Sequence, residues 1–261
     1  MLRLTRTLTG HRDALAALCG VGLKTTVATT RLGWLWWICD PLFMMGVYYF
    51  MVRLVFGRGG PDYHLFALTG IVCWQFFART VLLTAGSLRR NGQLLSHSTV
   101  PPETFTVVPV LIQLFFALIG CAIIVAWHWT GIGPATLWLF PVLGVMGLYA
   151  LALGALLSVF VVFMPDVSKF ADYGLRAGFF LSPVLYPAAA VSGSDRVPEL
   201  VKAVYGLNPM AWGITAMRGA ILDGTSPDTA PFLAALAGGL VLLQLALAVL
   251  RANRQNVMKH L

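Results

Sequence analysis

The chain has 261 residues, of which 58% are hydrophobic and only 11% are charged, and its mean hydropathy is +0.80. Soluble domains carry roughly a quarter charged residues, so this composition excludes a water-soluble globular protein and indicates an integral membrane protein. The net charge of +8 does not predict nucleic-acid binding, because the basic residues lie at the ends of apolar segments and in short connections, as topology-setting charges do.

The N-terminal segment, residues 1–33, mixes basic and apolar residues. Its longest apolar run, Ala14–Leu23, is too short to cross about 30 Å of hydrocarbon. No small-residue cleavage site followed by a soluble domain marks it as a signal peptide. We therefore expect a cytoplasmic amphipathic helix that lies in the membrane interface.

Six later segments reach about 18 apolar residues, the length needed to cross a bilayer. They are residues 34–56, 65–85, 105–127, 137–163, 174–191 and 232–250. The sequence thus predicts an all-α integral membrane protein with six transmembrane helices in a single domain, 34–250, followed by a cytoplasmic tail, 251–261.

The distribution of basic residues predicts the orientation of the spans. One side of the membrane receives Arg3, Arg6, Arg12, Lys24, Arg31, Arg89, Arg90, Lys169, Arg251, Arg254 and Lys259. The other side receives only Arg53, Arg58, Arg196, Lys202 and Arg218. Because basic residues concentrate on the cytoplasmic side, both termini are expected in the cytoplasm.

The segment Ala203–Leu222 is about long enough to be a seventh span, but it contains Asn208, Pro209 and Arg218. A seventh span would also place the basic tail outside, against the charge bias. We expect a re-entrant or interfacial hairpin on the outer side, residues 200–222, with its irregular backbone buried against protein.

A polar loop, Ser87–Thr104, separates the second and third predicted spans. Its Arg pair and Leu94–Leu95 indicate a short amphipathic helix, about Leu88–His97, which the prolines at 101 and 102 terminate. On the cytoplasmic side, such a helix suggests a docking element for a soluble partner.

Sequence motifs for catalysis or nucleotide binding are missing. The stretch Gly20–Thr26 resembles a phosphate loop, but Leu23 stands where that loop needs a glycine before the lysine. The chain has no H-E-x-x-H and no G-x-S-x-G motif. Its four cysteines are scattered and predict neither a disulfide framework nor a metal site: Cys19, Cys39, Cys73 and Cys121. The sequence does not predict an enzyme that acts alone.

Three ionisable residues lie within or at the edge of predicted spans, where charges are costly and face a partner, water or a pathway. Asp40 precedes Pro41 and either serves a pathway or accepts hydrogen bonds at a helix break. Arg79 is either a substrate contact or a structural anchor. Arg176 lies near the cytoplasmic end of its span and is expected to extend toward the interface.

A series of short motifs along the chain resembles those of one known protein family. The segment 31–41, with Arg31-Leu32-Gly33-x-Leu35-Trp36 and then Asp40-Pro41, resembles the opening of permease subunits of type-2 ATP-binding cassette exporters, in the branch that exports O-antigen, capsule and teichoic acid polysaccharides. Similar motifs follow in the same order: Gly70-Ile71-x-x-Trp74-x-Phe76-Phe77, Asn91-x-x-Leu94-Leu95 with Val100-Pro101, Phe163-x-x-Asp166, Ser182-Pro183-Val184-Leu185-Tyr186-Pro187, and Asn208-Pro209-Met210 with Arg218.

The chain departs from the family pattern at three positions. Pro165 replaces the arginine that usually precedes Asp166, so a salt bridge at that turn is in doubt. His97 stands where lysine is common, and Val100 where phenylalanine precedes the proline. The last two suggest a docking loop adapted to its own partner.

The resemblance implies a homodimer that pairs with two separately encoded ATPase subunits. ATP and Mg would be bound by those subunits, and no cofactor is expected in this chain. The polar loop would be the coupling helix that the ATPase pushes on. Its expected contact residues are Arg89, Arg90, Asn91, Leu94, Leu95, His97 and Pro101.

The resemblance also implies a route for a lipid-linked glycan. Its pyrophosphate would enter near Arg12, Lys24, Arg31 and Gly33, although these charges could equally be ordinary topology and lipid-headgroup charges. The glycan path would involve Tyr48, Tyr49, Trp74, Phe76, Phe77 and Arg79. The outer gate would involve Tyr186, Tyr205, Asn208, Pro209 and Arg218. The tryptophans at predicted span boundaries are typical of an aromatic belt.

The expected function is therefore export of a lipid-linked polysaccharide across the bacterial cytoplasmic membrane, with no enzymatic activity in this chain. The alternative is a type-2 exporter of a drug or a small lipid, which would predict a compact hydrophobic substrate.

Overall fold

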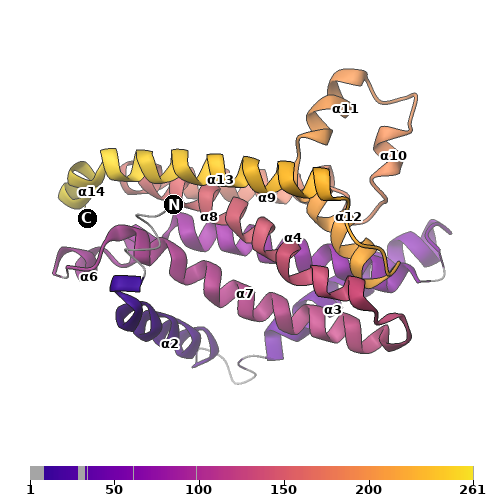
Figure 1. Cartoon of the computed structure of the whole chain (residues 1–261), viewed down its shortest axis with the longest axis horizontal. Coiled ribbons are helices and arrows are strands. Elements are labelled where there is room, and N and C mark those ends of the chain that lie inside the picture. Colours follow the sequence, from indigo (N-terminus) through magenta and orange to yellow (C-terminus); the bar gives the residue numbers. More distant parts are fainter. Residues whose placement is uncertain (1–8, 29–32, 34, 61, 98, 261) are drawn as a thin grey trace.

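The computed structural model describes residues 9–28, 33, 35–60, 62–97 and 99–260. In this part the chain forms a bundle of long helices that run beside one another along the longest axis of the molecule (Figure 1). Five described helical segments are long and apolar enough to cross a membrane. They are α3 Leu35–Tyr49 with its π-helical continuation η1 Phe50–Val55, α4 Tyr63–Ala85, α7 Pro102–Trp127, α8 Leu139–Phe163 with the preceding 3-10 turn η3 Pro134–Trp138, and α13 Thr229–Ala252.

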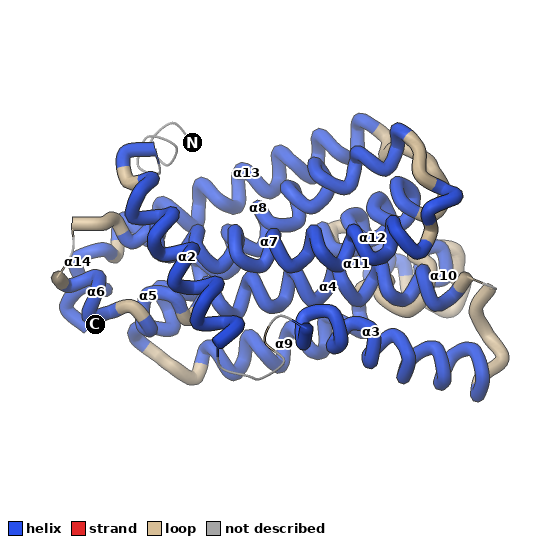
Figure 2. Tube along the Cα trace, turned by 90° about the horizontal axis from the view of Figure 1, so that it is seen from below, coloured by secondary structure: helices blue, strands red, loops and turns tan. Residues whose placement is uncertain are grey.

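Shorter helices complete the described chain. They are α2 Arg12–Ala28, α5 Ser87–Arg90, α6 Gly92–Ser96, η2 Trp129–Gly131, α9 Val167–Leu181, α10 Ala189–Ser192, α11 Glu199–Gly206, α12 Pro209–Ile221 and α14 Arg254–His260. The predicted N-terminal interfacial helix corresponds to α2, which packs along α7 (Figure 2).

The predicted fifth span, 174–191, is not one helix. The helix α9 begins seven residues earlier, at Val167, and ends at Leu181; the chain then turns through 182–187 before α10. Pro183 and Pro187 explain the break, because proline has no amide hydrogen and its ring obstructs the preceding helical turn. With 15 residues, α9 is not among the five candidate spans.

The core lies around α4 and α8, which are the two most buried of the candidate spans, whereas α3 has few fully buried residues and packs on the core from outside. Buried residues of α4, α7, α8 and α12 form the main hydrophobic cluster, which includes Leu68, Ile71, Met146 and Ile214. The exposed apolar faces of α3 and α13 therefore suit lipid or another protein chain.

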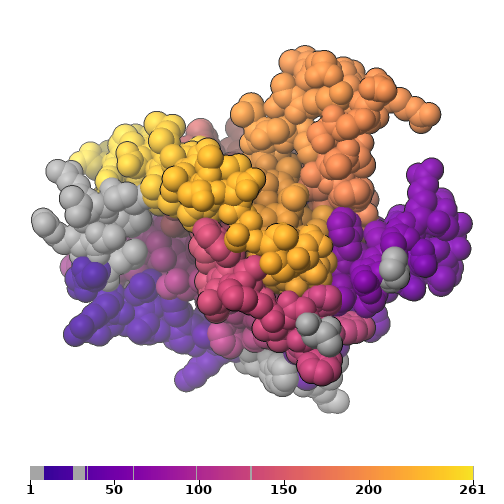
Figure 3. Space-filling view, turned by 45° about the vertical axis from the view of Figure 1, so that its right-hand side comes forward, coloured from indigo at the N-terminus to yellow at the C-terminus, as the bar shows by residue number. Residues whose placement is uncertain are grey.

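The two ends of the bundle differ. The helices α5, α6 and α14 gather at one end, with α2 beside it (Figures 1 and 2). At the other end, α10 and α11 form an arm that stands off the bundle (Figure 3). After this arm, α12 turns back and packs against α4 and α8.

Close packing between α4 and the turn at 182–187 requires a glycine at position 70. A Cβ atom there would lie 2.4 Å from the Val184 carbonyl oxygen and 2.6 Å from Nη2 of Arg218. At Gly144 on α8, a Cβ atom would meet nothing within 4 Å. The two glycines therefore offer a matched pair for testing this contact.

We expect Gly70→Ala to destabilise the protein by about 1–3 kcal/mol, as overpacking does. Gly144→Ala should be neutral or slightly stabilising, because alanine favours helix and has room there. Thermal unfolding of the two purified variants in detergent measures the difference. Equal midpoints for both variants would contradict the described packing.

Candidate functional site

The polar loop between the second and third spans forms two short helices, α5 and α6, instead of the single predicted helix. Asn91 separates them, with a φ angle of −108° and a ψ angle of 20°. Its side-chain Nδ2 donates to the Ser87 carbonyl oxygen at 2.8 Å, which caps the first helix. The break changes which residues of the loop face outward.

The inward side of this loop packs into a cluster that we call the cap cluster. Its buried members are Leu88, Leu95, Phe105, Val159, Val162, Leu250 and Val257. The exposed residues of the loop are Arg89, Arg90, Gln93, Leu94, Ser96 and His97. Adjacent leucines thus have opposite environments: Leu94 is 48% exposed and Leu95 only 2%. Of the two, only Leu94 is available to a partner.

The C-terminal helix α14 supports the loop from behind. Val257 is 1% exposed within the cap cluster, and Phe163 meets the His260 ring edge-on at 5.1 Å. Nearby, Nε of Arg251 lies 3.1 Å from Oε1 of the buried Glu103, which ties the end of α13 to the first turn of α7. Pro101 precedes that turn in an extended conformation.

The structure does not bring the predicted pyrophosphate residues together. Arg12 and Lys24 are exposed and lie 12 positions apart on α2, about 18 Å along a helix. Arg12 faces Asp13 at 3.8 Å. Gly33 has a φ angle of 49°, in the left-handed region that glycine tolerates. Arg31 lies outside the described residues.

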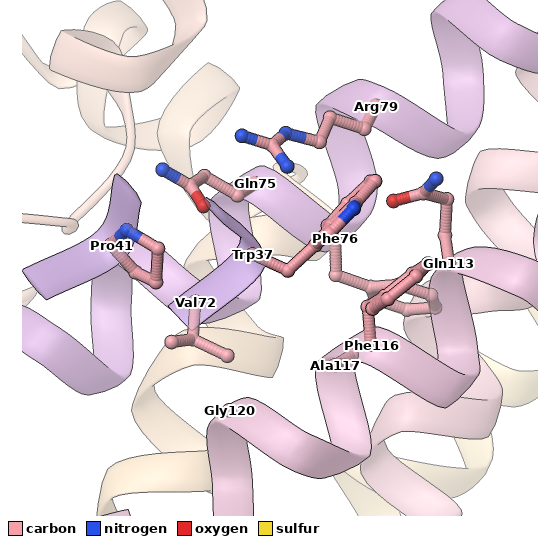
Figure 4. A pocket seen from close by; sticks show the side chains of 10 residues that line it. All are labelled: Trp37, Pro41, Val72, Gln75, Phe76, Arg79, Gln113, Phe116, Ala117 and Gly120. Atoms are coloured by element: carbon pink, nitrogen blue, oxygen red, sulfur yellow. The ribbon is translucent and has the colours of Figure 1, made fainter. Parts of the chain in front are cut away.

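Asp40 and Arg79 form an ion pair between α3 and α4, and Gln75 donates to the same carboxylate at 3.2 Å. The Arg79 guanidinium also lies over the Trp37 ring, 4.5 Å from its centre, and Trp37 stacks on Phe116 of α7 at 3.9 Å. Trp37, Gln75, Arg79 and Phe116 line a small cavity of about 20 Å³ (Figure 4). Within the chain, Arg79 therefore has the geometry of an anchor between helices.

The aromatic residues predicted for the glycan path have different locations. Trp74, Phe76 and Phe77 are buried in the main core. Tyr48 stacks on Phe179 of α9 at 5.5 Å, and Tyr49 meets His64 edge-on at 6.4 Å. The two tyrosines are partly buried and pack against the outside of that core.

An exposed polar and aromatic face on α9 was not predicted. Nη2 of Arg176 lies 2.9 Å from Oδ2 of Asp172, one turn away; the Arg176 side chain is exposed and that of Asp172 is partly exposed, with Tyr173 and Phe180 also exposed. In the sequence, Arg176 is three or four residues from each of Asp172, Tyr173 and Phe180, the spacing of neighbours on one face of a helix. It indicates a shared face but not what that face contacts.

Arg218 is the most heavily bonded of the predicted outer-gate residues. It is 5% exposed and donates to the carbonyl oxygens of Pro183 at 2.6 Å, Val184 at 2.6 Å and Phe66 at 3.0 and 3.1 Å. Its guanidinium also covers the Phe66 ring. Arg218 therefore joins α12, α4 and the turn that follows α9.

Other predicted outer-gate residues hold the same turn. Asn208 caps α12, accepting from the Met210 amide at 2.9 Å, and donates to Ser182 at 2.9 Å, while Pro209 occupies the first helical position. Tyr186 donates to the Phe180 carbonyl oxygen at 3.1 Å. The Tyr205 hydroxyl is buried without a hydrogen-bond partner among the described residues, and this burial raises its pKa.

Comparison with known proteins decides among the possible families. No protein-family model matches the chain. It is 27% identical to the O-antigen export system permease protein RfbA of Myxococcus xanthus. The match spans 260 residues, which is 98% of each chain. It is 26% identical over 216 residues to RfbA of Klebsiella pneumoniae, 81% of both chains. These similarities, over most of the chain, confirm the resemblance to ABC-2 type exporter permeases.

The family also includes the polysialic acid transport protein KpsM of Escherichia coli, to which the chain is 22% identical over 208 residues, 77% of this chain and 78% of that protein. The similarity supports an ABC transporter permease subunit, a kind of membrane component that is non-catalytic in its homologues. In the described ranges of the permease, no group of His, Cys, Asp and Glu residues could hold a metal ion.

We expect Arg218→Lys to lower the unfolding temperature of the permease markedly. A lysine ammonium cannot bond to the carbonyl oxygens of Phe66, Pro183 and Val184 together, as the planar guanidinium does. Each buried carbonyl left without a donor costs about 1–3 kcal/mol of folding free energy. Arg196→Lys, at an exposed position of the outer arm, is the matched control. Indistinguishable thermal unfolding of both variants would refute the anchoring role.

Proposed function

We propose that the chain is the channel-forming subunit of an exporter that moves a lipid-linked polysaccharide, of the O-antigen, capsule or teichoic acid type, across the bacterial cytoplasmic membrane. ATP hydrolysis in a separate partner subunit, which binds ATP and Mg, drives the movement. The similarity to an O-antigen export permease over 98% of both chains carries this proposal.

The proposed ATPase contact is the outward face of α5 and α6. Arg89, Leu94 and His97 project there, while the cap cluster and α14 hold the loop from within. A loop supported on its inner side transmits a push to α4 and α7 instead of yielding to it. The excess of basic residues in the N-terminal segment, this loop and the C-terminal tail supports a cytoplasmic location for the loop and for both termini.

We further propose that α9 completes a set of six spans and faces a second copy of the chain. A charged pair such as Arg176 and Asp172, open on the side of a single chain, is costly in hydrocarbon. A facing copy would shield the pair and leave a polar path between the two subunits. Tyr173 and Phe180 on α9, with Tyr48 nearby, would then offer aromatic faces to sugar rings.

The two ends of this path have their own proposed residues. Lys24, Arg31 and Gly33 would meet the pyrophosphate of the substrate at the cytoplasmic interface, where arginine and lysine favour phosphate, whereas Arg12, about 18 Å from Lys24 along α2, would contact lipid headgroups. The segment 200–222, held in place by Arg218 and Asn208, would close the outer mouth until the glycan is threaded.

The adjacent leucines of α6 test the coupling contact. Leu94→Asp should reduce transport-coupled ATPase activity by at least ten-fold while thermal unfolding of the permease remains unchanged, because the side chain is exposed. Leu95→Asp should instead lower the unfolding temperature, because it buries a carboxylate in the cap cluster. Normal ATPase stimulation by the Leu94→Asp permease would remove α6 from the proposed interface.

Cysteine labelling tests the proposed orientation. In a chain whose four native cysteines are replaced by serine, Asp195→Cys on the outer arm should react with a membrane-impermeant maleimide in intact spheroplasts. Asn256→Cys on α14 should react only after permeabilisation. Both positions are exposed, so a difference in labelling reports the side of the membrane. Labelling of position 256 in intact spheroplasts would contradict a cytoplasmic C-terminus.

A further inference from the structure

A cavity of about 420 Å³ lies between α2, α7 and the junction of α4 with α5. Its volume falls in the range of small-molecule sites, about 300–1,000 Å³. The lining residues are Leu18, Val21, Gly22, Thr25, Leu83, Ser87, Arg90, Asn91, Phe105, Val108, Pro109, Ile112 and Gln113. It is separate from the outward face of α6 that the proposed ATPase contact uses.

The lining has an apolar wall and a polar end. Val21 on α2 and Val108 and Ile112 on α7 form the wall, and the helices approach closely at Gly22, where a Cβ atom would lie 2.5 Å from Cδ1 of Ile112. The polar end is formed at the α4–α5 junction, where Ser87 and Arg90 lie. A cavity with this division suits an amphiphile better than a purely polar or a purely apolar molecule.

Arg90 supplies a positive charge at the polar end. Unlike its neighbour Arg89, it folds back along the end of α4, where it donates to the Leu83 carbonyl oxygen. No carboxylate of the described residues forms an ion pair with it. Partial burial lowers the pKa of its guanidinium, but arginine remains charged at neutral pH. The charge therefore lacks a counter-ion within the described chain.

Gln113 supplies a second polar group, deeper in the cavity. Its residue is 2% exposed and lies two turns into α7 from Phe105, about 12 Å along the helix. Within the described ranges, no group forms a hydrogen bond with its amide, although the side chain lines both this cavity and the smaller one shown in Figure 4. Its amide atoms are open to the cavity, so a ligand or a water molecule there would supply the hydrogen-bond partner that the protein does not.

We propose that this cavity binds the phosphate-bearing headgroup of an anionic phospholipid from the adjacent leaflet. Arg90 binds the phosphate, and Val21, Val108 and Ile112 contact the upper part of an acyl chain. Gln113 donates to an ester carbonyl deeper in the cavity. The lipid would fill the space between α2 and α7 and fix α2 beside the α4–α5 junction.

Native mass spectrometry of the full-length permease with added phosphatidylglycerol or phosphatidylcholine tests this site. We expect selective retention of phosphatidylglycerol by the wild-type chain. Arg90→Ala should weaken that retention about ten-fold, the effect of losing one charge-assisted phosphate contact. Arg89→Ala removes the same charge from the adjacent, outward-facing position and should retain the lipid as the wild type does.

Two further variants separate the cavity from general surface charge. Val108→Trp should fill the apolar wall and displace the lipid although every charge is kept, whereas Leu111→Trp, on an exposed part of the same helix, should not. Unchanged phosphatidylglycerol retention in both Arg90→Ala and Val108→Trp would overturn the proposal. Equal losses in Arg89→Ala and Arg90→Ala would overturn it too.

A last arm identifies the source of the phosphate. If undecaprenyl pyrophosphate displaces phosphatidylglycerol from the wild type, and Arg90→Ala retains undecaprenyl pyrophosphate itself about ten-fold less than Arg89→Ala does, the same site also accepts the phosphate of a polyprenyl carrier. Displacement of phosphatidylglycerol by inorganic phosphate alone would overturn the requirement for an amphiphile. None of these readouts depends on ATPase activity, so the lipid site and the proposed export function can fail independently.

Discussion

Arg218 donates hydrogen bonds to backbone carbonyl oxygens in the turn after α9, where a helix ends inside an apolar bundle. Hydrocarbon offers no hydrogen bonds, so backbone groups freed at a break need partners within the protein. Pro183 and Pro187 create the break after α9, and Arg218 donates to the carbonyl oxygens of Pro183 and Val184. The absence of a side chain at Gly70 leaves room for the guanidinium. The position of α12, and with it the outer arm, depends on this contact.

Much of the bundle follows from the apolar length of its segments. The predicted spans 65–85, 105–127, 137–163 and 232–250 each fall within a described helix or within a helix and its preceding 3-10 turn. The fifth span could not be placed by hydropathy, because the turn at 182–187 is as apolar as the helix before it. Its prolines are the signal that locates the break. The buried arginine that stabilises the break comes from a segment 34 residues away and is visible only in the folded chain.

The candidate site was less predictable than the fold, because sequence shows the type of a residue but not the direction it faces. Leu94 and Leu95 are identical in sequence terms, yet the break at Asn91 exposes one and buries the other. Trp74 and Phe77 suited a glycan path by composition, but they pack in the core, while the exposed polar face belongs to α9. The cavity beside Arg90 depends on how α2 packs on α7. The local pattern of residue types along the sequence does not predict that contact between distant segments.

The central claim is that this chain moves a lipid-linked polysaccharide out of the cytoplasm, and deletion of its gene in the native bacterium tests that claim most directly. Lipid-linked glycan should accumulate inside the cell and surface glycan should disappear, and the wild-type gene should reverse both changes. Surface glycan at normal levels, with no internal accumulation of its lipid-linked form, would contradict the account.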